Sequence, residues 1–361
     1  MTTTITIGPY HPYLLEPSVL DLEVQDDRIA RLTVTLGYVH RGVEQLMTQK
    51  TYRQNVLLAE RICGICSNVH TLAFCQATER LLEIEVPARA AFIRTVLVEL
   101  ERLHSHFLCL GLLAHAVHEA EGFSRLMGER EALIGLLERI SGNRVHYSTN
   151  TIGGVRRDLT PELAAEIQGL LGRMEALARF AVDSLQERGA LGAKVAGLGV
   201  VSAKEAMALG AVGPTLRATG VASDIRREEP YAAYPHVRFE VVTEAGGDVR
   251  ARYLVRAREA LESLAVIRQL LDGLPEGPIL GALKEPRLHE RREVIARVEA
   301  PRGELLYHVL SNGTNLPERV KIRTPTYANV QVLTQALKGE AVTSARAIIE
   351  SIDPCLSCTD R

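Results

Sequence analysis

The sequence contains no tryptophan, and aromatic residues make up only 4% of its 361 positions. The hydrophobic core must therefore be built mainly from Ala, Leu, Val and Ile. No block of basic residues occurs, and 42 Lys and Arg nearly balance 44 Asp and Glu. This distribution gives no electrostatic reason to expect nucleic acid as a partner, and it excludes a polybasic membrane-binding segment.

Long uncharged hydrophobic runs are also absent. The most apolar stretch, Val96 to Val117, contains Glu99, Glu101 and Arg102, which excludes a spanning helix of about 20 apolar residues. The N-terminus lacks the basic start, apolar run and cleavage site of a signal peptide. We therefore expect a reducing location on the cytosolic side, where any membrane association must come through partner subunits.

The alternation of apolar and polar residues predicts β-structure at both ends of the chain. The N-terminal hairpin pairs Val19–Val24 with Ile29–Leu36 around Asp26-Asp27, next to a short strand at 5–7. A second hairpin is expected at 294–298 and 304–310. Residues 236–243 are expected to be extended.

Helical periodicity begins near Thr51 and dominates the middle of the chain. Phe92, Val96, Leu100, Leu103 and Phe107 recur every three or four residues, which predicts an amphipathic helix. Further helices are expected at 125–140, 161–188 and 249–272, with two short helices within 326–350. We expect a single, mainly α (α+β) domain over residues 1–361. It would have a central long-helix bundle and small antiparallel sheets near the N- and C-terminal parts.

Six cysteines are too few for a disulfide scaffold in a chain of this length. Four of them form two CxxC pairs at opposite ends of the chain, Cys63 with Cys66 and Cys355 with Cys358. Each pair can direct two thiolates at one ion. A structural zinc site, a redox dithiol and a site for iron or nickel all remain open at this point.

The residues around the two pairs favour one of these options. Glu60–His70 and Ser351–Arg361 strongly resemble the two signatures of the large subunit of NiFe hydrogenases, RxCGxCxxxH and DPCxxCxxH/R. Other segments resemble the membrane-bound, energy-converting (Ech-like) branch of that family: His40–Glu44, Gly153–Val155, Val212–Arg217, Ala300–Glu304 and Arg323–Thr326.

The opening of the chain carries a second resemblance. Gly8–Pro12 is similar to the start that this branch shares with the quinone-site subunit of respiratory complex I. That subunit lacks the four cysteines, so their presence here favours a hydrogenase. The resemblance covers essentially the whole length of the chain.

The resemblance implies a nickel–iron centre whose iron carries CO and cyanide. Cys63 and Cys355 would be terminal nickel ligands, whereas Cys66 and Cys358 would bridge nickel and iron. Thiolates suit such soft, redox-active metals. The implied activity is the reversible reaction 2H⁺ + 2e⁻ ⇌ H₂.

The resemblance also implies catalytic residues around the metals. Arg302 would be suspended over the open metal position, with Asp353 as its partner, and Glu16 would relay protons from the terminal ligand Cys355. Without the family, Arg302 is a surface turn arginine and Glu16 is an exposed loop carboxylate. Asp353 can in addition cap the turn at Pro354.

Further residues would support the cofactor. His70 would donate a hydrogen bond to a bridging sulfur. Pro325 and Thr326 resemble the pocket that holds the cyanides, with the Thr hydroxyl as donor. Arg61 would help to neutralise the thiolate charge.

The sequence departs from many relatives at its last residue. They have a histidine that binds magnesium together with the glutamate at Glu44, but this sequence has Arg361, which cannot ligate a cation. Either the magnesium site is absent, or Arg361 replaces the ion by pairing with Glu44, which we favour. Position 361 is also where many relatives are cut after nickel insertion. We expect Cys75 and Cys109, outside the motifs, to be small buried hydrophobic residues.

No other cysteine motif could hold an iron–sulfur cluster. The chain is therefore expected to exchange electrons with an iron–sulfur small subunit, alongside other complex I-like hydrophilic and integral-membrane subunits. The alternative is a non-catalytic, complex I-like quinone or docking subunit with a structural metal on the four cysteines. A zinc-stapled binding protein is a third class, which leaves the contexts of Arg302 and Glu16 without an explanation.

Overall fold

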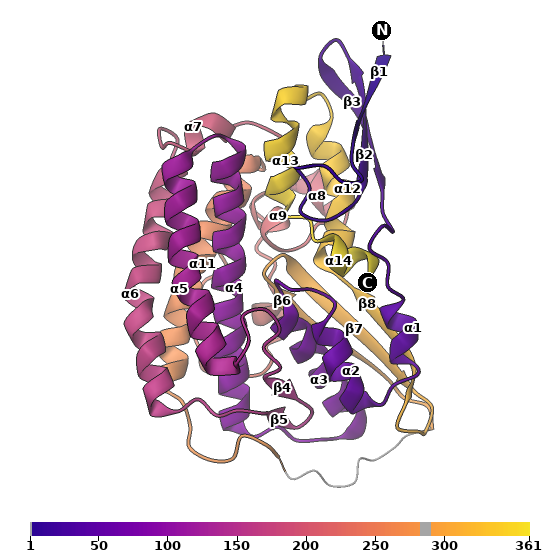
Figure 1. The fold of residues 1–361 in the computed structure, drawn as a ribbon, viewed down its shortest axis with the longest axis vertical. Helices are drawn as coiled ribbons and strands as arrows, with labels where there is room; N and C mark the ends of the chain where they lie inside the picture. Colours follow the sequence, from indigo (N-terminus) through magenta and orange to yellow (C-terminus); the bar gives the residue numbers. More distant parts are fainter. Residues whose placement is uncertain (1, 282–289) are drawn as a thin grey trace.

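The computed structural model of the chain describes residues 2–281 and 290–361. A bundle of long helices forms one side of the molecule, and a three-stranded sheet with shorter helices forms the other (Figure 1). The bundle consists of α4 (Ala88–Ala116), α5 (Ala120–Ser141), α6 (Pro161–Ser184) and α11 (Val249–Asp272). Helices α4 and α6 each pack against both α5 and α11. The expected mainly helical α+β fold with a central long-helix bundle is confirmed.

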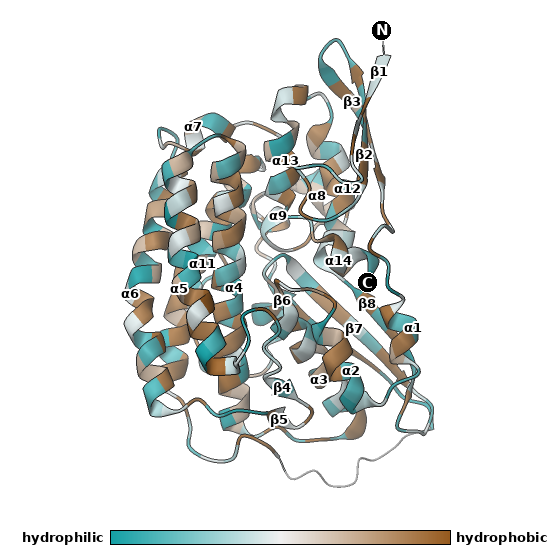
Figure 2. Ribbon diagram, in the orientation of Figure 1, coloured by the Kyte–Doolittle hydropathy of each residue, from teal (hydrophilic) through white to brown (hydrophobic). Residues whose placement is uncertain are grey.

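Helix α4 is buried on nearly all sides, because α3, α5, α11 and α13 surround it. The predicted apolar stripe from Phe92 to Phe107 is buried. Hydrophilic and hydrophobic positions alternate along the bundle helices (Figure 2). The polar face of α4, which an amphipathic helix would expose, is buried as well. Its buried ionisable residues are Arg94, Glu99, Glu101, Arg102, His104 and His106. Buried charges require internal partners, and these connect α4 to the rest of the fold.

Two predicted helix boundaries differ from the structure. Helix α5 begins at Ala120 rather than Arg125, because the Glu119 carboxylate accepts a hydrogen bond from the Gly122 amide at 2.6 Å and caps the helix. Helix α6 begins after the Thr160 cap, as predicted, but ends at Ser184 rather than Arg188.

The N-terminal sheet consists of β1 (Thr2–Ile7), β2 (Val19–Gln25) and β3 (Arg28–Thr35), all antiparallel. Asp26 and Asp27 form the predicted turn, and both have positive φ angles, 49° and 59°, as a two-residue type I′ hairpin requires. The sheet projects from one end of the molecule (Figure 1).

The C-terminal sheet contains one strand more than predicted. Strands β6 (Glu293–Ala300) and β7 (Gly303–Ser311) form the expected hairpin, and β8 (Pro317–Arg323) pairs with the other edge of β7. The proline at the start of β8 concealed it in the sequence, although proline is tolerated at the first residue of an edge strand. Helix α3 (Ser67–Leu82) packs against β6 and β7.

Residues 236–243, which were predicted to be extended, do not pair as a β-strand. In the middle of the described chain only the two-residue strands β4 (Asn150–Thr151) and β5 (Gly154–Val155) pair. The segment satisfies its backbone differently. The amide of Arg238 donates to the Gln269 side chain at 2.9 Å, and that of Glu240 donates to Glu262 at 3.1 Å. Side chains of α11 therefore accept the backbone hydrogen bonds that a neighbouring strand would otherwise accept.

Two loops far apart in the sequence meet inside the molecule. The loop between α2 (Tyr52–Glu60) and α3 lies beside the loop between α13 (Ala345–Ile352) and α14 (Leu356–Asp360). Helix α12 (Pro325–Leu337) packs against α13, α14 and β3. The short remaining helices are α1 (Val43–Met47), α7 (Gly192–Val195), α8 (Ala203–Ala208), α9 (Gly213–Arg217) and α10 (Ile225–Glu228), with 3₁₀ turns at Tyr234–His236 and Val342–Ser344.

Candidate metal centre

The four motif cysteines converge in one buried cluster. The Sγ atoms of Cys63 and Cys355 lie 3.4 Å apart, those of Cys66 and Cys358 lie 3.5 Å apart, and those of Cys355 and Cys358 lie 3.0 Å apart. All four side chains are at most 4% exposed, and none forms a disulfide. Residues separated along almost the entire sequence thus present four sulfur donors to one point.

Local backbone structure aims each pair. The Cys63 sulfur accepts hydrogen bonds from the amides of Ile65 and Cys66, at 3.3 and 3.5 Å, and Cys66 precedes the first turn of α3. In the second pair, the Cys355 amide donates to the Thr326 hydroxyl at 3.0 Å, and α14 begins directly after Cys355. Both pairs therefore sit at turns that lead into helices.

The four cysteine thiols differ in pKa. Hydrogen bonds from the other cysteine thiols lower the pKa of Cys63, and the Arg302 guanidinium lowers it further. A hydrogen bond with Cys358 is the chief cause that lowers the pKa of Cys355. The pKa values of Cys66 and Cys358 are raised by hydrogen bonds with Cys355 and, to a lesser extent, by burial. The first cysteine of each pair therefore ionises more readily than the second.

Arg302 and Asp353 form a buried pair beside the cluster. The Arg302 Nε atom donates to the Asp353 carbonyl oxygen at 2.8 Å, and Nη2 donates to the carboxylate at 2.7 Å. Both side chains are about 5% exposed or less. Arg302 Nη1 and Asp353 Oδ2 have no hydrogen-bond partner among the described residues. The free Nη1 belongs to a side chain that lines the cavity at the cluster.

This cavity is small, with a volume of about 10 Å³. It is lined by Cys66, His70, Ala300, Pro301, Arg302, Leu305, Pro325, Thr326 and Cys358. The donor set fits a soft metal centre, because three of the thiol sulfurs lie within 4.8 Å of one another and the fourth is in contact with two of them. The unpartnered Nη1 donor is a second feature that a bound group in the cavity would satisfy.

Pro325 and Thr326 lie at the start of α12 and line the same cavity as Cys66 and Cys358. The Thr326 hydroxyl accepts a hydrogen bond from the Cys355 amide. Its own hydrogen is then available to donate, since a hydroxyl can accept and donate at once. The lining of the cavity therefore includes a hydroxyl donor.

His70 lies between the cluster and a tyrosine that the sequence analysis missed. Its Nε2 atom is 3.5 Å from the Cys358 sulfur, and its Nδ1 atom is 2.8 Å from the Tyr307 hydroxyl. Burial lowers the pKa of His70 to about 3, so the ring is neutral. With Tyr307 donating to Nδ1, the single ring hydrogen is on Nε2 and points at the sulfur. Tyr307 comes from β7, and no local motif marks it.

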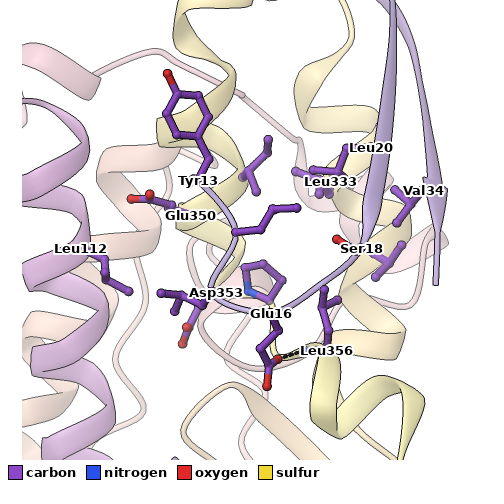
Figure 3. A pocket seen from close by; sticks show the side chains of 15 residues that line it. Tyr13, Glu16, Ser18, Leu20, Val34, Leu112, Leu333, Glu350, Asp353 and Leu356 are labelled. Carbon is purple, nitrogen blue, oxygen red and sulfur yellow. Dashed lines mark hydrogen bonds between the residues drawn. The ribbon is translucent and has the colours of Figure 1, made fainter. Parts of the chain in front are cut away.

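Glu16 lies in the loop between β1 and β2, against the second cysteine pair. Its carboxylate accepts hydrogen bonds from the amide of Leu356 (dashed in Figure 3), and from the amide and hydroxyl of Ser357. Burial, followed by the charge of Cys355, raises the pKa of Glu16. The side chain also lines a mainly apolar cavity of about 50 Å³ that Asp353 borders as well (Figure 3).

Arg61 caps the end of α2, two positions before Cys63. Its guanidinium is half exposed and pairs with Glu60 at 2.5 Å, and its carbonyl oxygen accepts a hydrogen bond from Arg41 at 2.9 Å. Arg302 is a cation that lowers the pKa of the Cys63 thiol. A contribution of Arg61 to neutralising the thiolate charge stays a prediction.

Two other residues hold the cysteine loops and were not singled out from the sequence. The Arg41 guanidinium donates to carbonyl oxygens of Ile62 and Ser357, both at 2.9 Å, and so ties the two loops together. The Glu101 carboxylate, from α4, accepts from the amides of Asn68 and Val69 at 2.6 and 2.9 Å and caps α3. Burial raises the pKa of Glu101 to about 8. Only the approach of α4 to α3 could reveal this role.

Glu44 and Arg361 pair as the sequence analysis favoured, with 2.8 Å between Oε1 and Nε. The Ile322 amide and Lys321 donate to the same carboxylate at 2.9 and 3.1 Å. Partial burial alone would raise the pKa of Glu44, but these partners lower it below its usual value. The interaction ties the last residue of the chain to β8.

This pair predicts a pH-dependent contribution to stability. Because the pKa of Glu44 is lowered by folding, its contribution is present above the pKa of the unfolded chain and is lost as pH falls through the folded value. We expect Glu44→Gln to lower the free energy of unfolding by about 1 kcal/mol at neutral pH, and the difference from the parent protein to disappear well below pH ~4. Denaturant unfolding across pH measures it. Glu318→Gln, at an exposed position on β8, is the control, and a pH-independent effect of Glu44→Gln would contradict the prediction.

Cys75 and Cys109 are buried, at most 2% exposed, as expected.

None of the helices in residues 2–281 and 290–361 combines the length and the hydrophobicity that crossing a lipid bilayer requires.

Two family profiles match the chain. Residues 119–295 and 282–361 match the respiratory-chain NADH dehydrogenase, 49 Kd subunit, and residues 41–117 match the nickel-dependent hydrogenases. The first match covers well over half of the sequence, and the second contains the first cysteine pair.

Individual relatives are similar over the full length. The carbon monoxide-induced hydrogenase of Rhodospirillum rubrum is 38% identical, with 100% of this chain and 99% of that protein covered. The membrane-bound hydrogenase subunit alpha of Pyrococcus furiosus is 38% identical, with 99% and 87% covered. A solved chain of the membrane-bound sulfane sulfur reductase, an archaeal respiratory membrane complex, superposes with a TM-score of 0.93 at 31% identity, covering 100% of this chain and 98% of its own length. The chain therefore belongs to the family that joins the large subunits of membrane-bound nickel-dependent hydrogenases with the 49 kDa subunit of respiratory-chain NADH dehydrogenase.

Proposed function

We propose that this chain is the catalytic subunit of a membrane-bound NiFe hydrogenase, which carries out 2H⁺ + 2e⁻ ⇌ H₂. The observation that carries the proposal is the convergence of four buried cysteine sulfurs beside the free Nη1 of Arg302. A nickel–iron centre with CO and cyanide on its iron would supply the redox-active metals at which H₂ is cleaved and formed.

The cysteines divide the work between them. Cys63 and Cys355 would hold the nickel, and Cys66 and Cys358 would hold both the nickel and the iron. The lowered pKa of Cys355 suits a thiolate that binds metal, and the carboxylate of Glu16 lies against the residues that follow it. Protons would pass between the Cys355 sulfur and the Glu16 carboxylate, whose raised pKa makes it easier to protonate than an ordinary carboxylate.

Arg302 would orient a molecule bound in the cavity and would not accept protons. Burial alone would lower its pKa, but Asp353 and the cysteine thiolates raise it well above its ordinary value, so the guanidinium remains charged. Held by Asp353 through two donors, it keeps Nη1 for a molecule in the cavity. His70 would donate a hydrogen bond to the Cys358 sulfur, and the Thr326 hydroxyl would donate to the cyanides.

The partners follow from the same proposal. Electrons pass to an iron–sulfur small subunit, because the two remaining cysteines, Cys75 and Cys109, are isolated buried thiols. Further complex I-like hydrophilic and integral-membrane subunits attach the chain peripherally to the cytoplasmic side of the membrane. The relatives named as membrane-bound hydrogenase and respiratory membrane complex support this assembly.

A second candidate is a non-catalytic, complex I-like quinone or docking subunit in which the four cysteines hold a structural metal. The match of residues 119–361 to the 49 Kd subunit favours it. Metal analysis of the complex purified without oxygen separates the two. One nickel per chain, with infrared bands of CO and cyanide, supports the hydrogenase, whereas zinc alone would contradict it.

The relay role of Glu16 predicts a separable defect. Glu16→Gln keeps an oxygen that can accept from the Ser357 amide, so the metals should stay bound, but the amide cannot carry a proton. We expect hydrogen–deuterium exchange with H₂ to slow by roughly 100-fold, measured by mass spectrometry of the gas phase.

The control is Glu350→Gln. Glu350 lines the same cavity but pairs with Arg346 at 3.0 Å, and its replacement should leave the exchange rate unchanged. A normal exchange rate in Glu16→Gln with full nickel content would remove the relay role.

A further inference from the structure

The turn that carries Arg302 is held by more than its side chain. Pro301 and Arg302 form the two-residue connection between β6 and β7, with Ala300 paired to Gly303. The Arg302 side chain is fixed by Asp353. The position of its guanidinium also depends on the backbone of the turn, which is contacted by a segment with no role in the proposed chemistry.

That segment is the start of α9. Gly213 has a φ angle of +65°, and its backbone lies directly on the turn. A Cβ added to Gly213 would lie 2.3 Å from the Gly303 Cα and 2.5 Å from the Arg302 carbonyl oxygen. Both distances are far shorter than a van der Waals contact, so no other residue fits at position 213 while the turn keeps its place.

Helix α12 holds the residue before Gly213 through two hydrogen bonds. The amide of Val212 donates to the Asn329 side-chain oxygen at 3.0 Å, and the Asn329 amide group donates to the Val212 carbonyl oxygen at 3.3 Å. Asn329 lies in the helix that begins with Pro325 and Thr326 at the cavity. One rigid element therefore positions both the α9 segment and a wall of the cavity.

The far end of α9 holds the strand that leads into the turn. Arg217 is fully buried, and its Nη1 atom donates to the Glu299 carboxylate of β6 at 2.8 Å. Its Nε atom donates to Glu259 of α11 at 2.7 Å. Arg102 of α4 donates to the carbonyl oxygens of Glu299 and Ala300 at 2.7 and 3.2 Å. Buried charges placed so close to the turn give it little freedom to shift.

We infer that Gly213 and Arg217 are positioning residues, which clamp the Pro301–Arg302 turn so that the guanidinium is held in place at the cysteine cluster. The inference rests on the proposed function in one respect only, namely that Arg302 acts on a molecule bound there. The clamp itself is a property of this chain's own contacts.

The test is Gly213→Ala in the full chain within its complex, read out by hydrogen–deuterium exchange of backbone amides. A methyl group must push the turn away, so amide exchange of the peptide that contains Arg302 and Gly303 should rise by roughly tenfold, since exchange reports local opening. H₂ turnover should fall by roughly 10- to 100-fold with nickel content unchanged, because a displacement of about 1 Å can cost about 100-fold in rate.

Gly210→Ala is the matched control. Gly210 has a φ angle of +70° in the same segment, and a Cβ there would meet nothing within 4 Å. Gly213→Ala in an Arg302→Lys background should cause no further loss of turnover, because the clamp acts through Arg302. Equal amide exchange in Gly213→Ala and Gly210→Ala would overturn the inference.

Two milder variants decide the matter should Gly213→Ala fail to assemble. Asn329→Ala removes both hydrogen bonds to Val212 and should raise amide exchange in the turn, and Arg217→Lys should do so less, because it keeps the buried charge. Unchanged exchange in both would overturn the clamp. The exchange measurement does not need hydrogenase activity, so a complex without nickel would refute the proposed function and still report on the clamp.

Discussion

Cys355→Ala is expected to abolish H₂ oxidation, proton reduction and H₂/proton exchange together. The Cys355 sulfur lies 3.4 Å from that of Cys63 and 3.0 Å from that of Cys358, so it contacts a sulfur of each cysteine pair. Removing one of four thiolate donors leaves soft metals without a complete ligand set. Nickel per chain should fall to a small fraction of the parent value, as measured by elemental analysis of the complex purified without oxygen.

The matched control is Cys75→Ala. Cys75 is also fully buried, in α3, but belongs to neither pair. Its replacement should cost only about 1 kcal/mol of stability through lost packing and should leave nickel content and turnover intact. H₂/proton exchange that persists undiminished in Cys355→Ala would contradict the ligand assignment.

Arg302→Lys is expected to separate metal binding from turnover. A guanidinium can make both contacts to Asp353 and still direct Nη1 at the cavity, whereas an ammonium is a single point of charge. The positive charge near the cysteines remains, so nickel should stay bound. We expect turnover to fall by roughly 100- to 1,000-fold, the cost of removing one preorganised donor from an active site.

Arg319→Lys controls for the substitution itself, because Arg319 is exposed on β8 of the same sheet. It should match the parent protein in nickel content and rate. Normal turnover in Arg302→Lys would show that H₂ turnover does not require the guanidinium. Arg302 would then have only a structural role in the turn.

Local sequence patterns account for much of the fold. The Asp26-Asp27 turn, the Thr160 cap of α6 and the bounds of α11 could be predicted because each depends on neighbours within a few residues. The burial of α4 on all sides could not, since its polar face has the composition of a solvated one. Long-range partners such as Glu79, which pairs with Arg94 at 2.6 Å, make that burial possible.

The candidate site divides in the same way. Its donor chemistry is local, because two intervening residues suffice to let both thiols of a pair approach one ion. The motifs also named Glu16, His70, Thr326 and Arg302, which all lie around the cluster. The role of Arg61 stays a prediction, since its distance from Cys63 along the chain does not fix the direction of its half-exposed side chain.

The sequence by itself predicted which four cysteines meet in the cluster and the metal chemistry that they favour. Only the tertiary structure decided that Arg41 ties their loops together, that Tyr307 orients His70, and that Gly213 lies on the Arg302 turn. These roles depend on contacts between elements far apart in the chain. Whether a buried charge is neutralised, or a backbone can approach closely, is fixed by three-dimensional packing and not by neighbouring residues.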